Sequence, residues 1–128
     1  MSTILLLDHD PALRDQLDAS LTNDDHVVII AANQHDALSL LSMIAVNLVI
    51  ANLSIPGLDW ASFCAESRAL PGYAQLPVIL LSTNVSQAIQ PSAEYTAFIR
   101  MAAPLPALRP LIRCSLRTSR QAAVAGGR

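Results

Sequence analysis

Four short runs of nearly continuous apolar residues, followed by a fifth and shorter one, constrain the fold of this 128-residue chain more than any other feature. Each of the first four is four to six residues long and rich in branched side chains. A strand is continuously apolar when both faces of its sheet are covered, as in parallel sheets, and buried helix segments are usually longer. The runs are residues 4–7, 27–32, 48–51, 78–81 and 97–99.

Helical patterns fill the intervals between these runs. Asp10 offers an N-cap, and the proline after it suits the first helical position. Leu13, Leu17 and Leu21 then recur at every fourth position, which is typical of a face packed on a core. The other expected helices are one capped by Asn33 with Ala37, Leu40, Leu41 and Ile44, one from Asp59 to about Ala69, and one from Pro104 or Pro106 to about Thr118.

The alternation of strands and helices predicts an α/β fold, with an open five-stranded parallel sheet and helices on both faces. The interval 83–94 differs from the others, because Pro91 would interrupt a helix there. The fourth helix is therefore expected to be shortened or broken. One domain is predicted over residues 1–118, and residues 119–128 are expected to form a disordered tail.

Composition narrows the range of functions. All eight basic residues are arginine, which excludes chemistry that needs a lysine ammonium, such as a Schiff base. A net charge of −2 gives no reason to expect nucleic acid or an acidic membrane as the partner. No apolar run approaches the roughly 18 residues of a membrane span. The N-terminus lacks the features of a secretory signal, so a cytoplasmic location is expected.

Charge is distributed unevenly along the chain. Through Glu66 the sequence has nine acidic residues and one base, Arg14, whereas seven arginines follow. Of these, Arg109, Arg113 and Arg117 recur at every fourth position of the last helix and form one stripe. The stripe is either a solvated face or a patch for an acidic partner, such as the acidic half of a second copy. Nucleic acid is disfavoured, because the stripe is short and lacks interleaved aromatic residues.

Polar residues follow several of the predicted strands. In an open α/β sheet, ligands bind beyond the carboxyl ends of the strands. The residues there are Asp8, His9 and Asp10 after the first strand, Asn52 after the third, Ser82 after the fourth and Met101 after the fifth. None of them forms a nucleophile–base pair, so no enzyme activity and no catalytic residue are predicted.

Residues 4–117 resemble the receiver domain of two-component response regulators. The stretches that carry the resemblance are Ile-Leu-Leu-Leu-Asp-His-Asp-Pro-Ala-Leu at 4–13, Asn-Leu-Val-Ile-Ala-Asn-Leu-Ser-Ile-Pro-Gly-Leu-Asp at 47–59 and Leu-Pro-Val-Ile-Leu-Leu-Ser at 76–82. The resemblance implies a flavodoxin-like sheet with strand order 2-1-3-4-5. It also implies phosphoryl transfer from a histidine kinase to an aspartate at the end of the third strand, with Mg²⁺ held by an acidic pair.

Three of the residues that would carry this chemistry are replaced. Asn52 stands where the resemblance implies the phosphoacceptor aspartate, and a carboxamide cannot act as a carboxylate nucleophile. The first acid of the metal pair is kept as Asp8, but the second is His9, whose nitrogen suits Mg²⁺ poorly. Met101 takes the place of the lysine that contacts the phosphoryl group, and its side chain is expected to fill the space of the lysine stem.

Several of the remaining site residues allow two interpretations. Ser82 matches the family's hydroxyl residue and either orients an anion or makes only local hydrogen bonds. Phe98 matches the family's switch aromatic and either changes rotamer or packs in the core. The stretch of Asp8, His9 and Asp10 either binds a transition metal such as Zn²⁺, or Asp10 caps the first helix while His9 is solvated.

One aromatic residue and two cysteines complete the candidate set. Trp60, the only tryptophan, either covers the vestigial site or anchors a partner, or it packs on the third helix. Cys64 and Cys114 are expected to be buried thiols on helices that cover opposite faces of the sheet, which rules out a disulfide between them.

These observations predict an atypical receiver that acts as a phosphorylation-independent signalling and protein-interaction module. Its partners are expected to be proteins, with self-association through the fifth strand and the last helix as one option. No cofactor is expected, and Mg²⁺ binding is expected to be weak or absent. The alternative function is a small-ligand or anion sensor that uses the vacant crevice at the strand ends.

Overall fold

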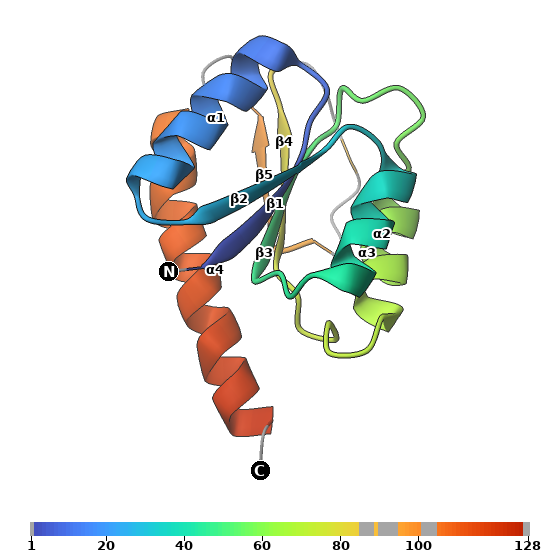
Figure 1. Ribbon diagram of the computed structural model, residues 1–128, viewed down its shortest axis with the longest axis vertical. Helices are drawn as coiled ribbons and strands as arrows, with labels where there is room; N and C mark the ends of the chain where they lie inside the picture. The colour runs from blue at the N-terminus through green and yellow to red at the C-terminus, as the bar shows by residue number, and fades with distance from the viewer. Residues whose placement is uncertain (1, 85–88, 90–94, 101–104, 127–128) are drawn as a thin grey trace.

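A computed structural model describes residues 2–84, 89, 95–100 and 105–126 of the chain. Within these residues, five parallel strands form one sheet in the order β2-β1-β3-β4-β5, which confirms the predicted fold class and strand order (Figure 1). The strands are β1 (Thr3–Leu7), β2 (Val27–Ala31), β3 (Leu48–Asn52), β4 (Val78–Ser82) and β5 (Ala97–Arg100). Each lies within one residue of its apolar run. The inner strands β1, β3 and β4 are buried except at Thr3, as expected for strands covered on both faces, whereas the edge strands β2 and β5 are only partly buried.

Four helices are present among the described residues: α1 (Pro11–Asn23), α2 (Gln34–Met43), α3 (Trp60–Ala69) and α4 (Leu105–Gly126). The three expected N-caps are confirmed. The side chain of Asp10 accepts a hydrogen bond from the backbone N–H of Ala12, and Asn33 and Asp59 cap α2 and α3 in the same manner. Ile44, expected within the second helix, is its C-cap and is exposed.

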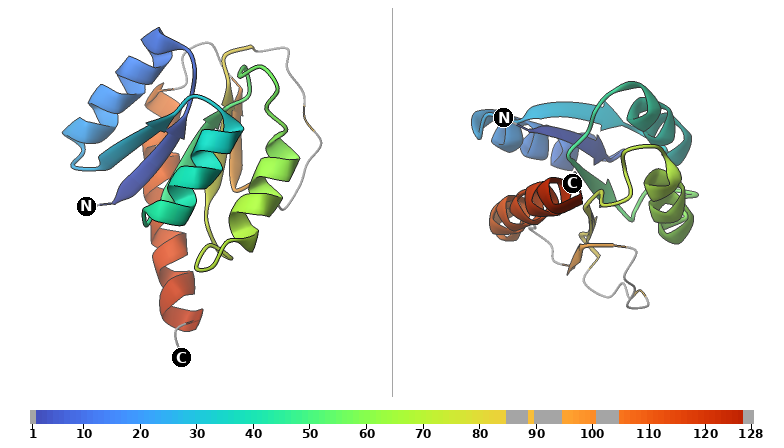
Figure 2. Two further views of the ribbon diagram at one scale, coloured as in Figure 1. Left: turned by 45° about the vertical axis from the view of Figure 1, so that its right-hand side comes forward. Right: turned by 90° about the horizontal axis from the view of Figure 1, so that it is seen from below.

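The helices cover the two faces of the sheet in pairs. α1 and α4 lie side by side on one face, and α2 and α3 cover the other (Figures 1 and 2). Successive residues of β1 point to opposite faces, so Ile4 and Leu6 join the core under α1 and α4, whereas Leu5 and Leu7 join the core under α2 and α3. All four are fully buried. The sheet is therefore an apolar layer that fixes the positions of its strand ends.

The last helix is longer than the sequence predicts. It ends at Gly126 and not near Thr118, so residues 119–126 are helical and the expectation of a disordered tail was wrong for them. Small residues at a chain end are typical of a tail, but the segment also contains alanine, glutamine and arginine, which favour helix. The C-terminal part of α4 extends past the end of the sheet (Figures 1 and 2).

The two cysteines lie on opposite sides of the sheet. Cys64 is buried on α3, as expected. Cys114 is exposed on α4, so the prediction of two buried thiols was wrong for this residue. It follows Arg113 on the outer face of the helix, whereas Ile112 and Leu116 point into the core.

Two further expectations concern the fourth helix and membrane-spanning segments. The shortened or broken fourth helix falls in the interval 83–94, most of which is outside the described residues. Among the residues that the structure describes, no helix is long and apolar enough to cross a membrane.

Candidate functional site

The candidate site lies at the carboxyl ends of β1 and β3, which are neighbours in the sheet. The register pairs Leu7 with Ala51, so the next residues, Asp8 and Asn52, face each other across the two strands. Asn52 is the last residue of β3, and its Nδ2 donates a hydrogen bond of 3.1 Å to Oδ1 of Asp8. Both side chains are buried. The fold thus brings together two residues that are 44 positions apart in the sequence.

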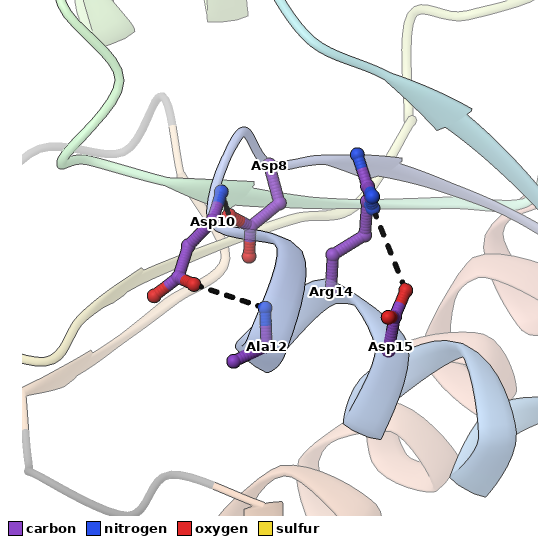
Figure 3. A network of polar contacts seen from close by, with 5 residues as sticks. All are labelled: Asp8, Asp10, Ala12, Arg14 and Asp15. Carbon is purple, nitrogen blue, oxygen red and sulfur yellow. Dashed lines mark hydrogen bonds and ion pairs between the residues drawn. The ribbon is translucent and has the colours of Figure 1, made fainter.

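The two carboxylate oxygens of Asp8 have different surroundings. Oδ1 also accepts a hydrogen bond of 2.9 Å from the backbone N–H of Asp10 (Figure 3). Oδ2 is buried and has no hydrogen-bond partner among the described residues. Burial raises the pKa of Asp8 above its ordinary value, while the hydrogen bonds from Asp10 and Asn52 act in the opposite direction.

The amide of Asn52 is held at both ends. Its Oδ1 accepts hydrogen bonds from the backbone N–H of Ser54 at 2.9 Å and from the Ser54 hydroxyl at 2.8 Å. These two donors fix the amide oxygen toward Ser54 and direct its nitrogen to Asp8. The loop then turns at Gly57, whose φ of 77° lies in the left-handed region that favours glycine. Ser54 was not predicted as a site residue, although an Asn-x-Ser pattern after a strand is typical of such a turn.

His9 and Asp10 follow Asp8 after the end of β1, and Asp10 has a structural role. Asp10 caps α1 through a hydrogen bond of 3.1 Å from the N–H of Ala12 to its Oδ1 (Figure 3). His9 is exposed. On the next turn, Arg14 and Asp15 form an exposed ion pair of 3.8 Å. No three metal-ligating side chains come together within the described part of the chain. The hydrogen bond from Ala12 agrees with the helix-capping interpretation of Asp10.

The residues expected on the phosphoryl side of the site make local contacts. Ser82 ends β4 and is buried, and its Oγ accepts a hydrogen bond of 3.1 Å from the N–H of Asn84. Phe98 is partly buried and packs against the core under α2 and α3, as its packing interpretation predicts. Met101 lies outside the described residues. The structure thus joins Asp8 to Asn52, whereas Ser82 bonds to its own loop and Phe98 belongs to the core.

Trp60 opens α3 and is partly buried against the core under that helix. Its ring meets Tyr95 edge-on, with a centroid distance of 5.4 Å and an interplanar angle of 81°. This contact links the start of α3 to the segment before β5 and agrees with the packing interpretation. Tyr95 was missed in the sequence, because no local pattern connects it to a residue so far back in the chain.

The arginine stripe on α4 is not uniform. Arg109 forms a bidentate ion pair with Asp24, with 3.0 Å from Nε to Oδ2 and 2.6 Å from Nη2 to Oδ1. The hydrogen bonds from Arg109 lower the pKa of Asp24 and raise the pKa of the guanidinium. Arg113 and Arg117 are exposed. Arg109 is exposed as well, but its guanidinium is held by Asp24, which lies 85 positions away and which the sequence did not connect with it.

Similar sequences are found in bacteria. The chain is 37% identical over 84 residues to the transcriptional regulatory protein AfsQ1 of Streptomyces coelicolor, which covers 66% of this chain and 36% of that protein. It therefore spans just over a third of the length of AfsQ1. An uncharacterized 14.6 kDa protein of Leptolyngbya boryana is 30% identical over 95 residues, covering 74% of this chain and 72% of that protein.

Solved structures share the fold at lower identity. A CheY-like receiver domain protein from Methanospirillum hungatei is 18% identical with a TM-score of 0.78, covering 94% of this chain and 98% of that one. TrrA of Thermotoga maritima, solved in complex with Mg²⁺ and BeF, is 21% identical with a TM-score of 0.77, covering 90% and 99%. Residues 4–98 match the family model of the response regulator receiver domain. Because that model covers most of the chain, the protein belongs to the receiver domain family of two-component signalling.

Proposed function

We propose that this protein is an atypical receiver that acts as a phosphorylation-independent protein-interaction module. The observation that carries the proposal is Asn52, a carboxamide at the carboxyl end of β3, where the resemblance implies the phosphoacceptor aspartate. Its nitrogen donates to Asp8 and its oxygen accepts from Ser54, so the amide is built into the local structure. A neutral amide that is held in this way is no nucleophile for phosphoryl transfer.

The residues at the site do not fit the magnesium ion that the family implies. Mg²⁺ is held by several hard oxygen ligands, usually including one or two carboxylates. Here Asp8 is the only buried carboxylate among the described residues, and one of its oxygens already accepts two hydrogen bonds. His9 is exposed and offers nitrogen, and the oxygen of Asn52 is occupied by Ser54. We therefore derive no step through Mg²⁺.

Phosphorylation by acetyl phosphate in the presence of Mg²⁺ tests the proposal directly. The wild-type protein is expected to show no gain of a phosphoryl group by intact-mass spectrometry. A triple variant with Asn52→Asp, His9→Asp and Met101→Lys restores the family's residues and is the matched positive control. An acid-labile phosphoryl group on the wild-type protein at the level of the triple variant would overturn the proposal.

A sensor of small ligands is the second candidate, and one atom favours it. Oδ2 of Asp8 is buried without a hydrogen-bond partner among the described residues. Buried polar atoms in proteins usually have such a partner, so a bound ligand could supply the missing donor. A carboxylate oxygen accepts hydrogen bonds or a cation and repels an anion, so the oxygen supports a neutral or cationic ligand over an anion. An amide NMR titration with Mg²⁺ as the cationic probe separates the candidates. Saturable shifts at Asp8 and Asn52 support the sensor, and their absence supports the interaction module.

A further inference from the structure

We infer that a pocket between the end of α1 and the first half of α4 binds a small zwitterion, namely an α-amino acid with an apolar side chain. The pocket lies just before β2, at the amino ends of the strands, whereas Asp8 and Asn52 lie at the carboxyl ends. The inference therefore goes beyond the proposed function. We call this pocket of about 410 Å³ the turn pocket, and it is lined by Leu21, Asn23, Asp24, Asp25, His26, Arg109, Ile112 and Arg113.

The charged side chains of the turn pocket differ in whether they have partners. Arg109 and Asp24 neutralise each other through their bidentate ion pair. Arg113 and Asp25 are exposed, and neither side chain has an ion-pair or hydrogen-bond partner among the described residues. The pocket thus offers one cation and one carboxylate that lie too far apart to form an ion pair with each other.

The position of Asp25 at the pocket is set by the backbone of the turn. Its N–H donates a hydrogen bond of 3.0 Å to the carbonyl of Thr22, and the N–H of His26 donates one of 3.1 Å to the carbonyl of Leu21. The φ of Asp25 is 65°, in the left-handed region that aspartate and asparagine adopt more readily than most residues. Asparagine can therefore replace Asp25 without changing the turn.

The ring of His26 supplies the observation that points to a ligand. Its Nδ1 atom is buried and has no hydrogen-bond partner among the described residues, although buried polar atoms usually have one. In the tautomer that carries the proton on Nε2, Nδ1 is an acceptor, so the partner it lacks is a donor such as an ammonium N–H. Asp25, the preceding residue, supplies the negative charge that favours an ammonium group.

A zwitterion provides partners for all three groups at once. Its carboxylate accepts hydrogen bonds from Arg113, and its ammonium group donates to Asp25 and to Nδ1 of His26. A simple anion is disfavoured because Asp25 repels it, and a simple cation leaves Arg113 without a partner. Leu21 and Ile112 belong to the core under α1 and α4 and also line the pocket, so they favour an apolar side chain on the ligand.

An amide NMR titration with L-leucine tests the inference. The matched compounds are isocaproate, which lacks the ammonium group of leucine, and isoamylamine, which lacks its carboxylate. Saturable shifts are expected at Asp25, His26 and Arg113, with a Kd on the order of 1 mM, because exposed ion pairs contribute little. Each matched compound, at the same ionic strength, should bind at least tenfold more weakly than leucine.

Two variants remove the charges one at a time. Arg113→Gln and Asp25→Asn should each weaken leucine binding at least tenfold, and the asparagine keeps the left-handed turn. The control is Arg117→Gln, which makes the same change one turn further along α4 and outside the pocket. It should leave the Kd for leucine unchanged. The amide spectrum of each variant also shows whether it is folded.

Three results would overturn the inference. They are the absence of saturable shifts with leucine, binding of isocaproate or isoamylamine as tight as that of leucine, and an equal loss of binding in Arg117→Gln. The first would mean that the pocket takes no amino acid, the second that one charge suffices, and the third that the effect comes from the general charge of α4. None of them affects the proposed function, whose failure would appear separately as phosphorylation of the wild-type protein.

Discussion

The side-chain amide of Asn52 donates a hydrogen bond of 3.1 Å to Asp8 and so joins the carboxyl ends of β3 and β1 inside the protein. Both residues are polar and buried, and such groups are costly when they lack partners. In this chain the amide supplies a donor to the carboxylate, whereas a second carboxylate at position 52 would repel it. Asn52 therefore stabilises the juxtaposition of the two strand ends.

Replacement of Asn52 by aspartate is expected to destabilise the metal-free protein at neutral pH. The variant loses a buried hydrogen bond and places two carboxyl groups in contact, so we expect a loss of roughly 1–3 kcal/mol in the free energy of unfolding. Urea unfolding at pH 7 in the presence of a chelator measures this difference. Asn23→Asp, an exposed substitution at the end of α1, is the matched control and should change stability little. Equal stability of the wild type and the Asn52→Asp variant would contradict the expectation.

Asp8→Asn is expected to stabilise the protein at neutral pH. Burial raises the pKa of Asp8 in the folded state above the ordinary value of 3.8, so the folded protein retains this proton when the unfolded chain has lost it. The stability of the wild type therefore falls as pH rises from 3.8 through the folded-state pKa, and a neutral amide in place of the carboxyl group removes that loss. The stability gap between the variant and the wild type should open over this range and stay open at pH 7.

Thermal unfolding between pH 3.5 and 7 measures the gap, and Asp18→Asn, at a more exposed site on α1, serves as the control. A gap that is independent of pH would show that Asp8 has the same pKa in the folded and unfolded states and would contradict the expectation.

The ion pair between Arg109 and Asp24 gives a pH dependence of opposite sign. Hydrogen bonds from Arg109 lower the pKa of Asp24 below 3.8, so the pair stabilises the fold above that value and the stabilisation is lost as pH falls through the folded-state pKa. Arg109→Ala should therefore be less stable than the wild type at pH 7 by a small amount, as is usual for exposed pairs, and equally stable near pH 2. Chemical denaturation at the two pH values measures this, with Arg117→Ala as the exposed control. A deficit that persists at pH 2 would point to lost packing of the arginine stem.

The strands and the first three helices could be predicted well, because the signals that define them lie between residues that are close in the sequence. Each strand is a run of apolar residues, and each of the first three helices begins with a side chain that caps it. Both signals can be recognised within a short stretch of the sequence. The rule that parallel strand ends meet at one edge also predicted Asp8 and Asn52 at the same edge of the sheet. That rule brings residues to the same edge, but it does not orient their side chains.

Two of the contacts that the sequence did not predict are between distant segments. Arg109 pairs with Asp24, and Trp60 packs on Tyr95, and in neither case does a periodic pattern connect the two residues. The length of α4 was also missed, because small and polar residues near a chain end are typical of a disordered tail. Helix periodicity correctly placed Cys114 on α4, but its exposure depends on which side of that helix meets the sheet.

The two cysteines are expected to differ sharply in their reactivity toward a thiol reagent. Cys114 is exposed on α4, whereas Cys64 is fully buried beneath α3 on the other face of the sheet. A disulfide has Cβ atoms about 4 Å apart, and a whole sheet lies between these two residues. Titration of the native protein with an aromatic disulfide reagent should therefore label one thiol quickly, and a second only when the chain is unfolded by denaturant.

Cys114→Ser should abolish the fast phase and leave the slow one, and Cys64→Ala should do the reverse. Two rapidly labelled thiols in the native wild type would mean that α3 opens on the timescale of the reaction, and no labelled thiol in denaturant would mean that the two cysteines are joined after all.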